Sequence, residues 1–113
     1  MDIKTRDSNS IVIFDIDGDI IRPAGISLHQ LVKSQLERGN RSILLNFLNV
    51  GFVDSFGVGE ILASYISTNN LGGKLKLARI SKKLYLVFQV TMLTRVLEIY
   101  DDEAAALKSF EKL

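Results

Sequence analysis

The chain contains no cysteine and a single histidine, which excludes thiol chemistry and multi-histidine metal sites within one chain. Its single proline excludes a proline-rich linker, and 14 basic against 13 acidic residues leave a net charge of only +1. This balance provides no basic excess for holding a nucleic acid backbone. No apolar run approaches the roughly 18 residues of a membrane span, and the first residues lack a signal-peptide core. We therefore expect a cytoplasmic protein without membrane insertion, direct nucleic acid contact, cofactor or metal.

What is present is enough for one packed domain. The 113 residues are 47% hydrophobic and 24% charged, a composition typical of globular proteins. Neither a repeat nor a change in composition divides the chain. We expect a single domain over residues 1–113.

Segments with strand and helix character alternate along the chain. Two β-branched or apolar runs predict buried strands at 11–16 and 42–48. Shorter strands are expected at 3–6, 74–78 and 96–99, and helices at 28–36, 58–66, 84–88 and 101–113. The order is strand, strand, and then three helix–strand pairs followed by a closing helix. Such alternation predicts an α/β fold with a mixed, mainly parallel sheet that begins with an antiparallel hairpin.

Apolar spacing predicts which helix faces are buried. The second helix presents its apolar residues at i, i+3, i+4, i+7 and i+8, which are Val58, Ile61, Leu62, Tyr65 and Ile66. The third helix is expected to bury Leu84, Val87 and Phe88. Its opposite face carries Tyr85 and Leu86, which with Val90 form either an exposed apolar patch or merely scattered surface residues.

The segment Asn49–Gly59 leaves a predicted strand and enters a predicted helix within a few residues. Ser55 is therefore expected at or just before a helix N-terminus, where unpaired N–H groups and the helix dipole tolerate a phosphate. The same residues have a simpler interpretation. Asp54 and Ser55 are ordinary capping residues, and Gly57 permits close packing.

The chain resembles the STAS domains, and among them the bacterial anti-sigma factor antagonists. The resemblance is highest in Phe52-Val53-Asp54-Ser55-Phe56-Gly57-Val58-Gly59, which is similar to the family's Asp-Ser-x-Gly-hydrophobic-Gly segment. It also covers the Asp17-Gly18-Asp19 turn, the helix at 28–36 and the Gly72-Gly73 strand start. The match extends through residues 81–101 into the final alanine-rich helix, and so over most of the chain.

The resemblance implies a regulatory binding module that is not an enzyme. Ser55 corresponds to the family's phosphoacceptor, phosphorylated by an anti-sigma factor that is itself a serine kinase and restored by a serine phosphatase. The unphosphorylated form sequesters the anti-sigma factor, and transcription by the sigma factor follows. The expected partner-binding residues are Asp17, Asp19, Asp54, Ser55, Phe56 and Gly57.

Details of these residues are left open. Asp54 either orients the serine or caps the helix, and Asp17 and Asp19 are expected to supply acidic rim contacts. Phe56 and Met92 depart from the family pattern, which often has a small or hydroxyl residue and a glycine at these positions. The fit to a kinase and the end of the third helix are therefore expected to differ.

Two alternatives remain. In the first, the domain is a STAS scaffold or accessory subunit of a signalling or transport complex, and Ser55 is only a cap. In the second, the strand ending in Asp15-Ile16-Asp17-Gly18 resembles the first motif of haloacid dehalogenase-like phosphatases. Asp15 would then be the nucleophile and Asp17 the acid/base beside Mg²⁺. Asp19 stands where a hydroxyl residue usually follows, which weighs against this alternative.

Overall fold

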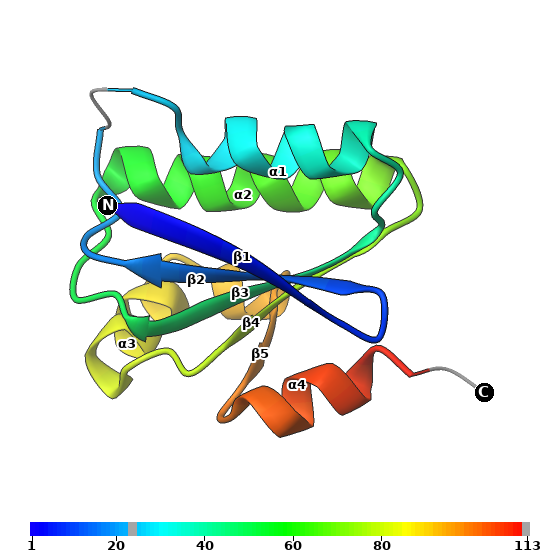
Figure 1. Ribbon diagram of the computed structural model, residues 1–113. Helices are drawn as coiled ribbons and strands as arrows, with labels where there is room; N and C mark the ends of the chain where they lie inside the picture. The colour runs from blue at the N-terminus through cyan, green and yellow to red at the C-terminus, as the bar shows by residue number, and fades with distance from the viewer. Residues whose placement is uncertain (23–24, 112–113) are drawn as a thin grey trace.

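The computed structural model describes residues 1–22 and 25–111, and its elements follow the predicted order (Figure 1). The strands are β1 (Asp2–Ser8), β2 (Ile11–Asp17), β3 (Ser42–Asn49), β4 (Lys74–Ala78) and β5 (Glu98–Tyr100). The helices are α1 (Leu28–Glu37), α2 (Ser55–Asn70), α3 (Lys82–Val90) and α4 (Glu103–Ser109). None of the helices in the described ranges has the length and hydropathy needed to span a bilayer.

The five strands form one sheet in the order β1-β2-β3-β4-β5. β1 pairs antiparallel with β2, from Asp2 opposite Asp17 to Ser8 opposite Ile11, and the other neighbours are parallel. Asn9 and Ser10 join the hairpin with φ angles of 49° and 68°, the left-handed conformation that suits a two-residue turn. The predicted fold class is confirmed.

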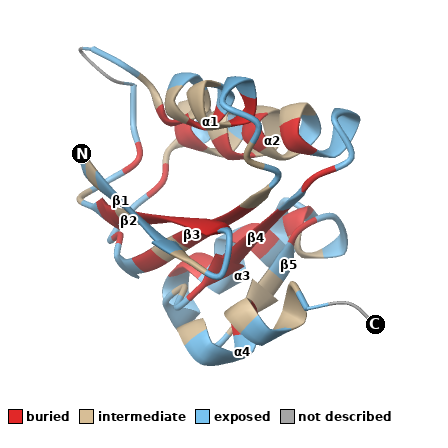
Figure 2. Ribbon diagram, turned by 45° about the vertical axis from the view of Figure 1, so that its right-hand side comes forward, coloured by how far each residue is buried: buried red, intermediate tan, exposed pale blue. Residues whose placement is uncertain are grey.

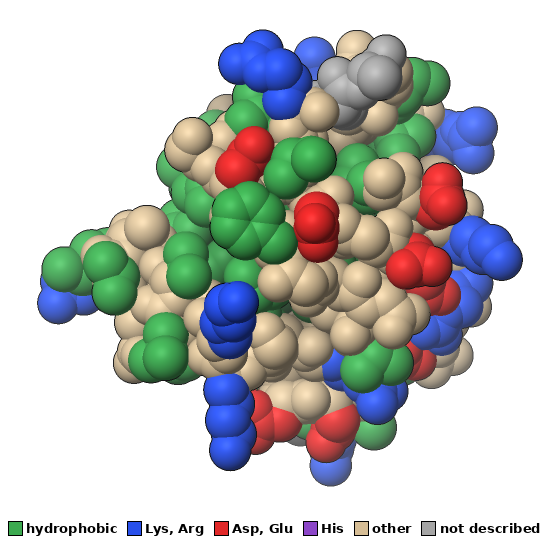
Figure 3. Space-filling model, turned by 90° about the vertical axis from the view of Figure 1, so that its left-hand side faces the viewer, with side chains coloured by type: hydrophobic (Ala, Val, Ile, Leu, Met, Phe, Trp, Pro, Cys, Tyr) green, Lys and Arg blue, Asp and Glu red, His purple; other side chains and the backbone are tan. Residues whose placement is uncertain are grey.

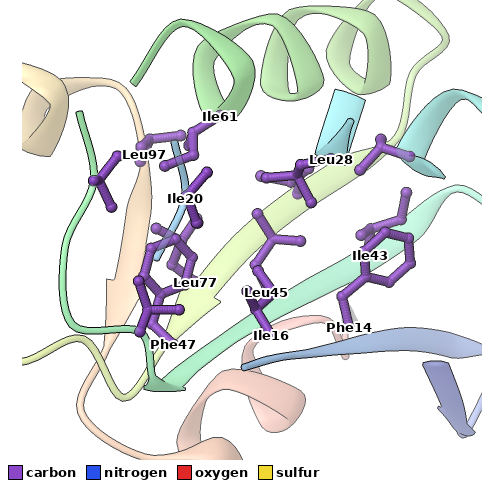
Figure 4. Packing of buried hydrophobic residues seen from close by; sticks show 14 of the residues in the cluster. Phe14, Ile16, Ile20, Leu28, Ile43, Leu45, Phe47, Ile61, Leu77 and Leu97 are labelled. Atoms are coloured by element: carbon purple, nitrogen blue, oxygen red, sulfur yellow. The ribbon is translucent and has the colours of Figure 1, made fainter. Parts of the chain in front are cut away.

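Helices cover both faces of the sheet. α1 and α2 lie on one face and α4 on the other (Figure 1). The larger hydrophobic cluster lies between the sheet and α1, α2 and α3, and includes Phe14, Leu45 and Phe47 (Figure 4). A smaller cluster joins the opposite face to α4 through Ala106. The central strands are therefore buried along most of their length (Figure 2).

The predicted apolar face of α2 packs against the core at four of its five residues: Ile61 is buried, and Val58, Leu62 and Tyr65 are partly buried. Gly57, Ile61, Ser64 and Thr68 are buried, whereas Ile66 is 47% exposed and its predicted place in the core is wrong. The hydroxyls of Ser64 and Thr68 donate to carbonyls four residues earlier, at 2.7 and 2.8 Å. Hydroxyl residues satisfied in this way can be buried at no hydrogen-bonding cost. Their small size lets α2 pack closely, a requirement that apolar periodicity does not reveal.

The third helix buries a narrower stripe than predicted. Leu84 and Phe88 are buried, and the Phe88 ring meets Phe47 edge-on with centroids 6.3 Å apart. Val87 is 38% exposed, so its predicted burial is wrong. Met92 ends this region in the left-handed conformation, at φ 66°, where glycine would be less strained.

The last strand and helix are shorter than expected. A 3₁₀ turn at Leu93–Arg95 delays β5, and Val96 is exposed before the strand begins. α4 starts at Glu103 because Asp102 caps it, accepting from the Ala105 N–H at 2.7 Å. The end of the predicted helix, at residues 112–113, lies outside the described residues.

A buried lysine joins α4 to the sheet. Lys76 on β4 is only 3% exposed, and its ammonium donates to the carbonyl and hydroxyl oxygens of Ser109, both at 3.0 Å. The same nitrogen lies 3.4 Å from the Glu98 carboxylate and 4.7 Å from the centre of the Phe110 ring. Burial opposes ionisation of Glu98, but its hydrogen bond from Tyr100 and the charge of Lys76 outweigh burial and lower its pKa.

Candidate functional site

The loops that follow β2 and β3 run side by side at the carboxyl edge of the sheet. Three backbone hydrogen bonds join them: Gly18 N–H to Asn49 O at 3.0 Å, Ile20 N–H to Phe52 O at 2.9 Å, and Asp54 N–H to Ile20 O at 3.2 Å. Ile20 and Val53 form an isolated parallel bridge between the loops. Binding sites of open α/β sheets gather at this edge. The pairing brings the predicted turn at Asp17–Asp19 to the same edge as the start of α2.

Gly57 allows the start of α2 to approach this loop. A methyl group at position 57 would overlap the carbonyl oxygen of Ile20 and come within 2.8 Å of the Val53 side chain. Gly57 is buried, so it shapes the site from beneath rather than offering a surface. Gly59, one half-turn further on, has nothing within 4 Å of such a methyl group.

Asp54 is the N-cap of α2. Its carboxylate accepts a hydrogen bond from the Gly57 N–H at 2.7 Å, which identifies capping as its structural role. Ser55 is the first residue of the helix and is exposed. The serines at the starts of α1 and α3 differ, because Ser27 and Ser81 are themselves the caps and accept hydrogen bonds through their hydroxyls.

The edge of the sheet at which α2 begins faces the viewer in Figure 3, where both acidic and hydrophobic side chains reach the surface. Asp17 and Asp19 are exposed, and Phe56 is half-buried. The Arg22 guanidinium lies 5.2 Å from the centre of the Phe56 ring, a cation–π distance. Arg22 is thereby held next to the residue that follows Ser55.

Three residues of this edge were missed in the sequence: Arg22, Leu48 and Phe52. Leu48 and Phe52 are 54% and 51% exposed. Alternation along β3 could have identified Leu48, since it directly follows the buried Phe47. No comparable signal exists for Arg22, because its position depends on how the loop after β2 folds.

Asp15 and Asp17 line one hollow of about 560 Å³ on the sheet, together with Arg6, Asn46 and Glu103. Arg6 donates to both Asp15 oxygens, at 2.6 and 3.0 Å, and Asn46 donates at 2.7 Å. These hydrogen bonds, led by Arg6, outweigh burial and lower the pKa of Asp15. Arg6 also donates to Glu103 at 3.0 Å.

Asp15 therefore joins β1, β3 and, through Arg6, α4. A carboxylate held in this way has a structural function, whereas a phosphatase nucleophile must be free to attack phosphorus. Within the described ranges, no group of three or more His, Cys, Asp or Glu side chains is placed to hold a metal ion.

Comparisons with known proteins agree with this architecture. The sequence model of the STAS domain matches residues 2–106. The anti-sigma F factor antagonist of Paenibacillus polymyxa is 23% identical over 112 residues, which cover 98% of this chain and 96% of the relative. A crystal structure of an anti-sigma factor antagonist from Mycobacterium paratuberculosis has a TM-score of 0.83 at 16% identity, covering 96% of this chain and 92% of that one.

A third similar protein is the Bacillus cell fate determinant SpoIIAA. Its phosphorylated form has a TM-score of 0.74 at 20% identity and covers 97% of this chain and all of that one. Its unphosphorylated form, an anti-sigma factor antagonist, has the same TM-score at 19% identity. The family model spans nearly the whole described chain, and the relatives match along almost their full length. The chain therefore belongs to the STAS domain family, within the group of anti-sigma factor antagonists.

Proposed function

We propose that this protein is a cytoplasmic anti-sigma factor antagonist that is switched by phosphorylation of Ser55. The unphosphorylated protein binds an anti-sigma factor with serine kinase activity and frees a sigma factor for transcription. Phosphorylation by that kinase releases the complex, and a serine phosphatase restores binding. The protein itself is substrate and ligand in this cycle.

The observation that carries the proposal is the placement of Ser55. It is exposed at the first position of α2, while Asp54 provides the cap. A hydroxyl that is not needed as a cap can accept a phosphate without uncapping the helix. The N-terminal end of the helix also accommodates an anion, so the fold need hardly change. SpoIIAA, which shares this fold, is known in a phosphorylated form.

The charge of the phosphate explains how binding would be lost. Phosphorylation adds about −1.5 to −2 charges at pH 7. Asp54 and the exposed Asp19 belong to the same edge, so the modified surface becomes more acidic and costs more to desolvate. Arg22, held over the Phe56 ring, offsets part of this charge within the free protein. A loss of about 3 kcal/mol weakens a complex more than 100-fold.

The modification is tested by incubating the full chain with Mg-ATP and the kinase-type anti-sigma factor from the same organism. Mass spectrometry of tryptic peptides should locate one phosphate on Ser55. The variant Ser81→Ala should still be phosphorylated, because Ser81 is a cap, whereas Ser55→Ala should not. Phosphate on another residue, or none on the wild type, would contradict the proposal.

The electrostatic step is tested separately with two variants of nearly equal size. Ser55→Asp should bind the anti-sigma factor far more weakly than Ser55→Asn, while Ser55→Ala should bind like the wild type. Binding is measured by isothermal titration calorimetry at two salt concentrations. Equal affinities for the aspartate and asparagine variants would favour the alternative of a STAS scaffold without a switch.

A further inference from the structure

Exposed apolar side chains concentrate on and just after α3. Within the described residues, thirteen large hydrophobic side chains are exposed, and six of them lie between residues 85 and 96. They are Tyr85, Leu86, Val87, Val90, Met92 and Val96. Leu86 and Val90 are 61% and 81% exposed and lie four residues apart, hence on one side of the helix. Leu84 and Phe88 are buried against the sheet, so this apolar side faces away from the protein.

The same part of the chain has an unusual charge distribution. Residues 61–97 contain six Lys or Arg and no Asp or Glu, although the whole chain has a net charge of only +1. Lys76 is buried and paired, but Lys82, Lys83 and Arg95 are exposed in the same stretch of chain as the apolar side chains. A partner that covers this surface must therefore offer apolar side chains bordered by acidic ones.

The surface also contains a hollow. A cavity of about 500 Å³ opens between the start of α3 and the end of β5, with Ile80 and Ile99 among its apolar walls. Tyr85 and Leu86 form another part of its lining, and Lys82 and Asp101 contribute charges of opposite sign. A hollow of this kind accepts a projecting side chain, as at the anchor positions of protein interfaces. A flat lipid surface has no such projection.

We infer that the α3 surface, defined by Lys82, Lys83, Tyr85, Leu86, Val90 and the hollow beside them, docks an acidic amphipathic helix of a partner protein. A large apolar residue of that helix occupies the hollow, and neighbouring residues one turn apart cover Leu86 and Val90. Its glutamates or aspartates pair with Lys82 and Lys83. The site does not use Ser55, so it provides contact with a partner in either phosphorylation state.

The test uses a designed peptide as a probe. It is an amphipathic helix of about 18 residues, with Leu and Phe at i, i+3, i+4 and i+7 and Glu on its other positions. Fluorescence anisotropy measures its affinity for the full chain, and amide shifts of ¹⁵N-labelled protein locate it. We expect shifts at α3, β5 and the hollow, and binding at least tenfold weaker for the same peptide with Lys in place of Glu.

Surface variants with matched controls test the position. Leu86→Gln with Val90→Gln, and separately Lys82→Glu with Lys83→Glu, should each weaken binding about tenfold or more. The controls Ile66→Gln on α2 and Lys33→Glu on α1 are also exposed and should leave it unchanged. Ser55→Asp should have no effect either, which separates this inference from the proposed switch.

Several results would overturn the inference. They are absence of peptide binding, shifts confined to the Ser55 edge, and equal binding by the Leu86 and Val90 double variant. Binding of the wild type, but not of that variant, to phosphatidylglycerol vesicles and not to the peptide would identify a membrane surface instead. A concentration-dependent dimer that the same variant abolishes would identify a second copy of the chain.

Discussion

Helices α2 and α3 follow the neighbouring parallel strands β3 and β4 and begin at the same edge of the sheet. The serines at their N-termini have different roles. At α3, Ser81 is the N-cap and its hydroxyl accepts the Leu84 N–H at 3.2 Å. At α2 the cap is Asp54, and the serine lies one position later. A shift of one residue thus separates a hydroxyl that stabilises a helix from one that is exposed without capping it.

The two starts also differ in what surrounds them. The start of α2 is packed against the loop after β2 at Gly57 and lies among acidic residues. The start of α3 carries two exposed lysines, followed by exposed apolar side chains. One edge of the sheet therefore holds two surfaces of different character, suited to different contacts. Unfolding measurements on variants of both helix starts test this contrast.

The largest effect is expected at the packed start of α2. Gly57→Ala places a methyl group against the Ile20 carbonyl, so the backbone must shift, and we expect a loss of roughly 3 kcal/mol in the free energy of unfolding. Gly59→Ala is the matched control, since its methyl group meets open space; it should be neutral or stabilise by up to about 1 kcal/mol. Urea denaturation measures both variants. Equal stabilities would mean that the start of α2 is not held tightly against the loop.

A smaller effect distinguishes caps from non-caps. Asp54→Ala and Ser81→Ala each remove a capping acceptor and should each lower the free energy of unfolding by about 1 kcal/mol. Ser55→Ala should change it by less than about 0.5 kcal/mol, because the Ser55 side chain is exposed and does not cap the helix. The same denaturation experiment compares the three. A loss at Ser55 as large as that at Ser81 would break the contrast between the two starts.

The smallest effect concerns the Arg6–Asp15 pair, which stabilises the sheet away from both helix starts. The pKa of Asp15 is lowered by the hydrogen bonds from Arg6 and then by Asn46. Its contribution is therefore complete above about pH 4 and is lost as the pH falls through the lowered pKa. Both side chains are partly exposed, so the contribution is no more than about 1 kcal/mol.

The measurement compares wild type and Asp15→Asn by thermal unfolding from pH 7 to pH 2. The wild type should be the more stable at pH 7, and the difference should narrow in the acidic range. Combining Asp15→Asn with Asp54→Ala should give additive losses, since the two positions share no partner. If the difference in stability between the two proteins is the same at every pH, the ionised Asp15 carboxylate does not stabilise the fold.

Much of the fold was predictable because it rests on local signals. Ile11–Phe14 in β2 is a continuous apolar run typical of a buried strand, and the alternation of strands with helices permits few topologies. These local signals failed where the burial of a residue depends on how closely two elements approach each other. Ser64 and Thr68 are buried because α2 lies close to its neighbours, and Val87 is exposed because a short helix contacts the sheet along one stripe.

The candidate site was likewise predictable only in part. The position of Ser55 near a helix start follows from the motif around it, because a strand, a capping residue and an apolar helix occur in immediate succession. The identity of the cap did not follow, since Asp54 and Ser55 are both suitable residue types. Arg22 and Phe52 join the site only through the pairing of two loops that are distant in the sequence.

The order of the elements, the class of the sheet and the segment that carries the phosphoacceptor candidate could all be read from the sequence, since each depends on neighbouring residues. Only the packed structure shows which hydroxyl caps a helix, why position 57 excludes a side chain, and which oxygens accept hydrogen bonds from Lys76. It also collected the apolar side chains and cations of α3 around a hollow whose other wall comes from β5. These features depend on approaches between distant segments, and packing sets such distances only when all the elements are in place.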